Sequence, residues 1–302
     1  MASKKNKFSS DAMSDTEEET QMSEQQPVVR KYGFLVSKRD ARDQHFDARM
    51  GMTGLGDPPP SASNRDLVVD ILDQGSASSC IANAGSQQLR CQLTLQGIHA
   101  PLASRRFAYY GLRALEHQQN VDGGGYIRNL YRAWNTFGYC SERTLSYDIE
   151  AINAQPTETA FMEAFANKIK LGYYRIDIAD PADLTGTALT NLQYSRQRSI
   201  KHALAARHTV EFGTAVDVDT FPKVKGSQAI SPPTFSATVG GHAMLAVGYD
   251  AAGVQVVNSW GQDFGDGGFC TLSWDYMLDP RTSDLWTIEV LDAPKFYTGA
   301  SV

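Results

Sequence analysis

DQGSASSCIANAGSQQLRCQLTLQG, residues 73–97, is the most informative stretch of the chain, because a glycine-containing loop runs directly into a long helical pattern. Apolar residues recur at helical spacing through the second half of the stretch. Ser79 is a suitable N-cap, and Gly97 is a suitable stop. The pattern predicts a helix over about residues 79–96 with a cysteine in its first turn.

Cys80 is a candidate nucleophile, because the partial positive charge at a helix N-terminus lowers the pKa of a thiol. Gln74 precedes it in the loop, and its side-chain amide can donate to an oxyanion that forms near Cys80. A buried cysteine at a helix start is also a common structural feature. This stretch alone does not distinguish the two interpretations.

Two further motifs follow far downstream. In VGGHAMLAVGYD, residues 239–250, His242 follows two glycines and opens a strand, where an imidazole can take a thiol proton and return it to a leaving amine. In VVNSWGQDFGDGGF, residues 256–269, Asn258 ends a strand. A hairpin between the two motifs brings Asn258 beside His242, where its amide can fix the imidazole tautomer.

The remaining chain separates into helical and strand-like halves. After the helix at residues 79–96, helical patterns recur at residues 104–118, 125–138, 157–170 and 195–207. From residue 209 onward, short β-branched or alternating runs are broken by glycine. Helices followed by strands indicate an α+β fold, with two layers that meet at a cleft.

The order of Gln74, Cys80, His242 and Asn258, each in its own motif, resembles the papain-like cysteine peptidases over roughly residues 30–290. The resemblance implies a two-lobed fold with a helical left lobe, a β-barrel-like right lobe and an active-site cleft between them. It implies Cys80 as nucleophile, His242 as base, Asn258 as the orienting residue and Gln74 as the oxyanion donor.

The resemblance also implies a substrate-binding region in DGGGYIRN, residues 122–129. Gly124 and Gly125 match the glycine pair that binds the substrate backbone as a short strand. Tyr126 and Ala243 would then line the second substrate subsite.

The sequence departs from the family pattern near the nucleophile. The aromatic residue usual after the nucleophile is Ile81, and the glycine usual two residues before it is Ser78. A tryptophan of the third motif is replaced by Phe264, and the partners of the common left-lobe disulfide are missing. These departures bear on rate and specificity more than on the reaction.

Composition excludes several function classes. The net charge of −6 argues against a nucleic-acid partner, and no apolar run is long enough to span a membrane. The four cysteines have no spacing typical of a metal site, so neither a metal nor another cofactor is expected. No conventional secretory signal is present, which favours the cytoplasm or export by a route without a classical signal peptide.

The chain divides into a disordered tail over residues 1–29, an N-terminal segment and linker over 30–63, and a peptidase domain over 64–295. Residues 30–50 mix aromatic and charged side chains and stand where the family carries an inhibitory pro-segment. One hypothesis places the stretch near Tyr32–Arg42 in the cleft, where it limits access as in a zymogen. The other has it pack across the domain as a structural strap.

Three functions are compatible with the motifs. The first is a cysteine endopeptidase that hydrolyses peptide or protein substrates through an acyl thioester on Cys80. The second is an acyltransferase that uses the same three residues. The third is a catalytically weak member that binds proteins through its cleft or its N-terminal tail, a role that does not require Cys80, His242 and Asn258 to be retained together.

Overall fold

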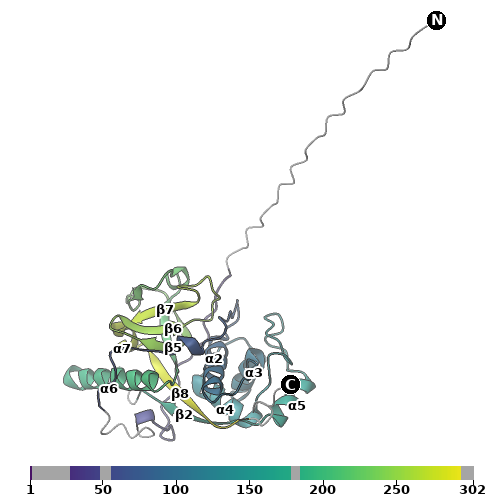
Figure 1. The fold of residues 1–302 in the computed structure, drawn as a ribbon, viewed down its shortest axis with the longest axis horizontal. Helices are drawn as coiled ribbons and strands as arrows, with labels where there is room; N and C mark the ends of the chain where they lie inside the picture. The colour runs from purple at the N-terminus through teal and green to yellow at the C-terminus, as the bar shows by residue number, and fades with distance from the viewer. Residues whose placement is uncertain (2–27, 48–55, 178–183, 294–302) are drawn as a thin grey trace.

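The structure, a computed structural model, describes Met1 and residues 28–47, 56–177 and 184–293 (Figure 1). The expected disordered tail therefore lies outside the described residues, apart from Met1, Val28 and Val29. Two hydrophobic clusters dominate the interior, one centred on the helices and one on the sheet. No helix among the described residues is both long and apolar enough to cross a membrane.

One lobe is helical. It consists of α2 (Cys80–Leu95), α3 (Arg105–Ala114), α4 (Ile127–Phe137) and α5 (Glu158–Ala166). Side-chain caps start two of these helices, since the hydroxyls of Ser104 and Thr157 accept the N–H groups of Phe107 and Ala160. α4 ends at Gly138, whose φ of 94° lies in a region that favours glycine.

The other lobe is an open eight-stranded sheet with the order β2-β8-β3-β5-β6-β7-β4, in which β1 pairs with β5. The strands are β1 (Ala62–Ser63), β2 (Lys170–Arg175), β3 (Val210–Asp217), β4 (Ala229–Ile230), β5 (Val239–Tyr249), β6 (Gly253–Val257), β7 (Phe269–Ser273) and β8 (Ser283–Asp292). Helices α6 (Gly186–Ala205) and α7 (Trp274–Leu278) pack on this lobe, and short 3-10 turns lie at Arg65–Leu67 and Phe221–Lys223.

The α+β class and the main helices are confirmed, with differences at the element ends. α6 begins at Gly186, earlier than the pattern at residues 195–207 indicated. The helical pattern at residues 157–170 ends sooner, because Lys170 begins a strand that pairs with β8. That pairing joins positions more than 100 residues apart, so local periodicity does not reveal it.

Helix α2 lies between the lobes (Figure 1). It packs against β5 and β8 on one side and against α3 and α4 on the other. This position leaves its first residue, Cys80, at the junction where the helices meet the sheet.

A polar network is buried where α2 and α4 meet the sheet. The Tyr131 hydroxyl lies 2.9 Å from Gln88 Oε1 and 2.8 Å from Glu211 Oε2. Gln88 Nε2 donates to two backbone carbonyls, so its oxygen is the acceptor that faces Tyr131. A hydroxyl has only one hydrogen to donate, so Glu211 must be protonated and donate to Tyr131. Burial raises the pKa of Glu211 well above its ordinary value, in agreement with a protonated side chain.

The N-terminal segment has two parts. Residues 37–47, here named the anchor, pack at the β2–β8 side of the sheet. The Ser37 N–H donates to Asp284 at 2.7 Å, and the Gln44 carbonyl accepts from the Arg175 N–H at 2.7 Å. Phe46 is buried in the core of the sheet lobe. Residues 30–36, here named the cleft strand, run along the junction of the two lobes and are described with the site.

Candidate active site

Cys80 is the first residue of α2, and its side chain is fully buried. Burial raises the pKa of its thiol to about 11. The backbone N–H groups of Ala243, Gly33 and Ile81 face the sulfur and oppose this rise. The expectation that the helix N-terminus lowers the pKa of Cys80 is therefore wrong for this state, because loss of solvent outweighs the N–H groups.

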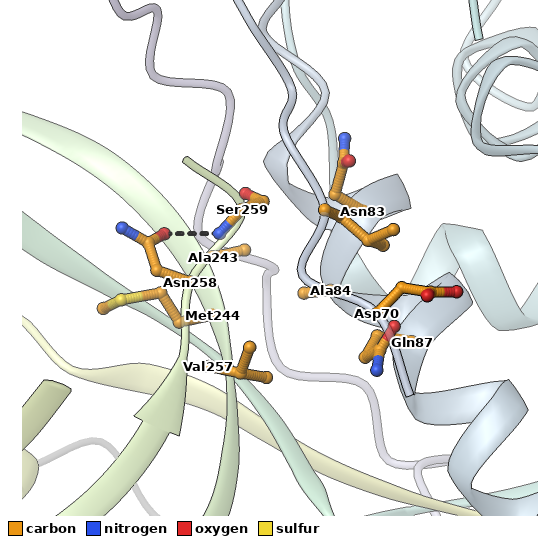
Figure 2. Close-up of a pocket in the computed structure, with 10 residues that line it drawn as sticks. Asp70, Asn83, Ala84, Gln87, Ala243, Met244, Val257, Asn258 and Ser259 are labelled. Carbon is orange, nitrogen blue, oxygen red and sulfur yellow. Dashed lines mark hydrogen bonds between the residues drawn. The ribbon is translucent and has the colours of Figure 1, made fainter. Parts of the chain in front are cut away.

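His242 lies on β5 and is also fully buried. Its Nε2 lies 2.7 Å from Asn258 Oδ1. The same oxygen accepts the Ser259 N–H at 2.8 Å, which identifies that atom as the amide oxygen (Figure 2). Nε2 of the neutral ring must then carry the hydrogen, which leaves Nδ1 as the basic nitrogen. Nδ1 is buried and has no hydrogen-bond partner among the described residues.

Asn258 reaches His242 because β5 and β6 form an antiparallel hairpin in which Leu245 faces Val257. Trp260 covers the imidazole, with ring centroids 4.7 Å apart and planes inclined by 32°. The indole is itself buried, so it shields the bond between His242 and Asn258 from water.

The His242 imidazole is held neutral. Burial lowers its pKa to about 4, the bond to Asn258 opposes the change, and the charge of Arg30 lowers the pKa further. Arg30 belongs to the N-terminal segment, so this segment acts on the base through its charge. With a thiol pKa of about 11 and an imidazole pKa of about 4, both groups are neutral at pH 7.

Gln74 lies in the loop before α2 and is fully buried. Its Oε1 accepts from the Ser259 hydroxyl at 2.7 Å, which orients the amide. Its Nε2 donates to the carbonyls of Ala77 at 2.8 Å and Lys31 at 3.1 Å. The amide expected to face an oxyanion thus faces a carbonyl of the N-terminal segment.

The cleft strand pairs with the loop that contains Gly124 and Gly125, as an added β-strand would. The Gly125 N–H donates to the Gly33 carbonyl at 2.8 Å, and the Leu35 N–H donates to the Gly125 carbonyl at 2.9 Å. Phe34 pairs with Gly125 in the parallel direction. A Cβ on Gly124 would lie 2.1 Å from the Gly33 carbonyl oxygen, so the close approach requires glycine there.

Side chains of the cleft strand fill the space around the base and beyond it. The Tyr32 ring meets His242 edge-on with centroids 6.2 Å apart. Phe34 is buried in the same cluster as Ala243, and its ring lies where a Cβ on Gly213 would be. Tyr126 instead lines a hollow beside Ser37, where the anchor begins.

A small hollow of about 10 Å³ lies behind Asn258, between α2 and the sheet. Figure 2 shows its walls, with Asn83, Ala84 and Gln87 on the helix side and Ala243, Met244 and Val257 on the strand side. This volume suits a single water molecule and no larger ligand. Among the described residues no group of three or more His, Cys, Asp or Glu side chains is arranged to hold a metal ion.

Sequence reasoning missed several residues of the site. Gly33 and Gly213 give the cleft strand its close approach, and Asp73 and Asp122 pair with its cations. A glycine between Tyr32 and Phe34 was the available signal, because a chain that passes close to a backbone often needs glycine. The two aspartates had no signal, since only the fold brings them to the cleft.

Comparisons with known proteins agree with this geometry. A family model described as "Papain family cysteine protease" matches residues 59–278. The chain is 27% identical, over 287 residues, to an "uncharacterized peptidase C1-like protein" of Acanthamoeba polyphaga mimivirus, covering 88% of this chain and 89% of that protein.

Solved structures show a similar fold. The cysteine protease xylellain from Xylella fastidiosa superposes with a TM-score of 0.71 at 24% identity, covering 89% of this chain and 99% of that one. A procathepsin B from Trypanosoma congolense superposes with a TM-score of 0.62 at 14% identity, covering 87% of each chain.

Proposed function

Because the chain belongs to the papain family of cysteine proteases, and is thus a peptidase, we propose that it is an endopeptidase with Cys80 as its nucleophile. The observation that carries the proposal is the 2.7 Å bond between His242 Nε2 and Asn258 Oδ1. This bond leaves Nδ1 free to accept a proton, and Ala243, the residue after His242, has its N–H at the Cys80 sulfur.

The proposed reaction proceeds in two steps. Nδ1 of His242 takes the thiol proton, and the sulfur of Cys80 attacks the peptide carbonyl carbon. The tetrahedral oxyanion accepts hydrogen bonds from the Cys80 N–H and Gln74 Nε2. Imidazolium returns the proton to the amine as the C–N bond breaks, and an acyl thioester remains. Water, deprotonated by the imidazole, then attacks the thioester and releases an acid and the thiol.

We propose further that the cleft strand keeps the full chain latent. The N–H of Gly33 faces the Cys80 sulfur, and the Lys31 carbonyl accepts a hydrogen bond from the Gln74 side-chain amide. The segment thus occupies both the oxyanion donor and the space beside the nucleophile, so a substrate can enter only after the segment leaves.

The other two candidate functions have less support. Protein binding alone does not require the bond by which Asn258 fixes the tautomer of His242. An acyltransferase with the same residues would pass the acyl group to an amine in place of water. Product analysis with and without an added amine separates transfer from hydrolysis.

Turnover of a peptide library by the full chain tests the proposal. Cys80→Ala is expected to abolish cleavage without unfolding the protein. Cys91→Ala is the matched control, because Cys91 is a buried free thiol on the same helix and has no role in the reaction. Full turnover by Cys80→Ala, or equal losses in both variants, would refute the assignment.

A further inference from the structure

The cleft strand carries two cations into the cleft, and each meets a carboxylate there. Lys31 Nζ lies 2.9 Å from Asp122 Oδ2, and Arg30 pairs with Asp73. Asp73 directly precedes Gln74 in the nucleophile loop, and Asp122 lies two residues before the glycine pair. The cleft therefore presents a carboxylate to each cation of the cleft strand.

The two oxygens of Asp122 have different tasks. Oδ1 accepts the Ser78 N–H at 2.9 Å and the Tyr109 hydroxyl at 2.8 Å, which ties the nucleophile loop to α3. Oδ2 has Lys31 as its hydrogen-bond donor. The Tyr109 hydroxyl in turn accepts the Gly124 N–H at 3.0 Å, so the orientation of the carboxylate is fixed from both sides.

The environment of Asp122 favours a cationic partner. Its side chain is only 11% exposed, so an unpaired charge there would be costly. Burial alone would raise its pKa, but hydrogen bonds from Lys31, Tyr109 and Ser78 hold the pKa below its ordinary value. When the cleft strand leaves, Oδ2 loses this donor and becomes available to another cation.

Lys31 also marks where a substrate residue would lie. Its carbonyl accepts from Gln74 Nε2 at 3.1 Å while its ammonium contacts Asp122. One residue thus places a carbonyl at the oxyanion donor and a cation at the carboxylate. Only the positions of the Lys31 carbonyl and the Lys31 ammonium matter here. A substrate is not required to run in the same direction as the cleft strand.

We infer that the peptidase prefers substrates with a lysine or arginine as the residue whose carbonyl is attacked, and that Asp122 Oδ2 binds this side chain. The inference rests on the proposed function. It adds a specificity-determining residue that the sequence pattern did not single out.

The test compares two fluorogenic peptides that differ only in lysine or norleucine before the cleaved bond. The ratio of the two kcat/KM values is measured on the full chain. Both peptides meet the same fraction of molecules with an unseated cleft strand, so this fraction cancels from the ratio. We expect a lysine preference of about tenfold to a hundredfold, the usual value of a hydrogen bond to a charged group. Asp122→Asn keeps an acceptor for Ser78 and Tyr109, and we expect it to bring the ratio close to one.

Asp73→Asn is the matched control, because it removes a negative charge from the same cleft at the position paired with Arg30. It should change the lysine-to-norleucine ratio less than twofold. A third peptide, with glutamate at the same position, tests the wild type without any substitution. The expected order of kcat/KM is lysine, norleucine, glutamate.

The outcomes separate the two claims. Cys80-dependent turnover with a ratio near one, another order of the three peptides, or an unchanged ratio in folded Asp122→Asn would overturn the specificity inference alone. Turnover of all three peptides that persists in Cys80→Ala would overturn the proposed function and the inference with it. Turnover of none of them even by Gly33→Ala, in which the cleft strand is expected to be unseated, would do the same.

Discussion

Gly33 is the residue on which closure of the cleft depends. A Cβ at this position would lie 1.8 Å from the Ser78 carbonyl oxygen, and a backbone atom cannot move aside cheaply. We expect Gly33→Ala to unseat the cleft strand and raise peptide turnover about tenfold or more. Gly56→Ala is the control, because a Cβ there meets nothing within 4 Å. Equal turnover by Gly33→Ala and wild type would contradict latency.

In the proposed mechanism, Asn258 orients the base and takes no part in bond making. Its oxygen holds His242 Nε2–H, so Asn258→Ala frees the ring to adopt the other tautomer or to rotate. We expect kcat/KM to fall by less than the roughly 10²–10⁴-fold that loss of a general base costs. His242→Ala, measured beside it in the Gly33→Ala background, supplies that reference. An Asn258→Ala loss as large as that of His242→Ala would argue for a more direct role.

At the level of secondary-structure elements, a cluster of buried ion pairs around Arg175 holds the anchor to β2. Arg175, on β2, is almost fully buried and pairs with Asp43 of the anchor at 3.3 Å, with Asp177 at 3.1 Å and with Asp284 at 3.2 Å. We expect Arg175→Met to destabilise the protein by about 3–5 kcal/mol, because buried Asp284 loses its cationic partner, while Asp43 and Asp177 keep only Arg128 and Arg39. Urea unfolding measures the change. Arg42→Ala breaks an exposed pair with Asp40 and should have almost no effect.

The junction of α2, α4 and β3 holds a neutral carboxylic acid. Because the folded pKa of Glu211 is raised, the folded state keeps a proton that the unfolded chain releases above its ordinary pKa of about 4.5. Stability is therefore lost as pH rises above that value. We expect Glu211→Gln to stabilise the protein by about 1 kcal/mol or more at pH 8 and less at pH 5. Thermal melting at both pH values checks this, and an equal change at both would contradict a protonated Glu211.

At the scale of the whole molecule, closure of the cleft strand is linked to pH. In the closed state the pKa of His242 is about 4, below its ordinary value of 6.5. When the cleft opens at a pH between these two values, the imidazole takes up a proton. The closed state also holds Cys80 near 11, above the ordinary 9, so opening releases a proton at alkaline pH. Closure is thus favoured most between about pH 6.5 and 9.

We expect acid to open the cleft. Turnover by the full chain, divided by turnover of Gly33→Ala at the same pH, should rise on the order of tenfold between pH 7 and 5. The division removes the pH dependence of the reaction itself. A ratio that stays constant or falls on acidification would contradict the linkage.

The local patterns were sufficient for much of the fold. The helix that starts at Cys80, the strand that carries His242 and the strand that ends just before Asn258 follow from periodicity and glycine positions, which are properties of neighbouring residues. The expected cap, Ser79, makes no side-chain capping bond. The early start of α6 and the β2–β8 pair were not predictable in this way. The first extends beyond the apolar pattern, and the second joins segments that are distant in the chain.

The two hypotheses for the N-terminal segment each describe a different part of it. Residues 30–36 lie in the cleft, and residues 37–47 pack as a strap beside β2 and β8. Both parts contain aromatic and charged residues, so composition does not separate them. Gly33 meets the backbone of Ser78, whereas Phe46 enters the core, and these contacts exist only in the folded chain.

Local motifs were enough to propose Cys80, Gln74, His242 and Asn258 as the residues of thiol chemistry, because each stands in a motif whose local geometry suits one task. The protonation states of the thiol and the imidazole depend on the folded chain. A thiol at a helix start is activated when solvated, yet here the chain's own segment excludes water, brings Arg30 toward the imidazole and leaves both groups neutral. Burial and charge depend on what packs nearby, and no reading of neighbouring residues supplies that.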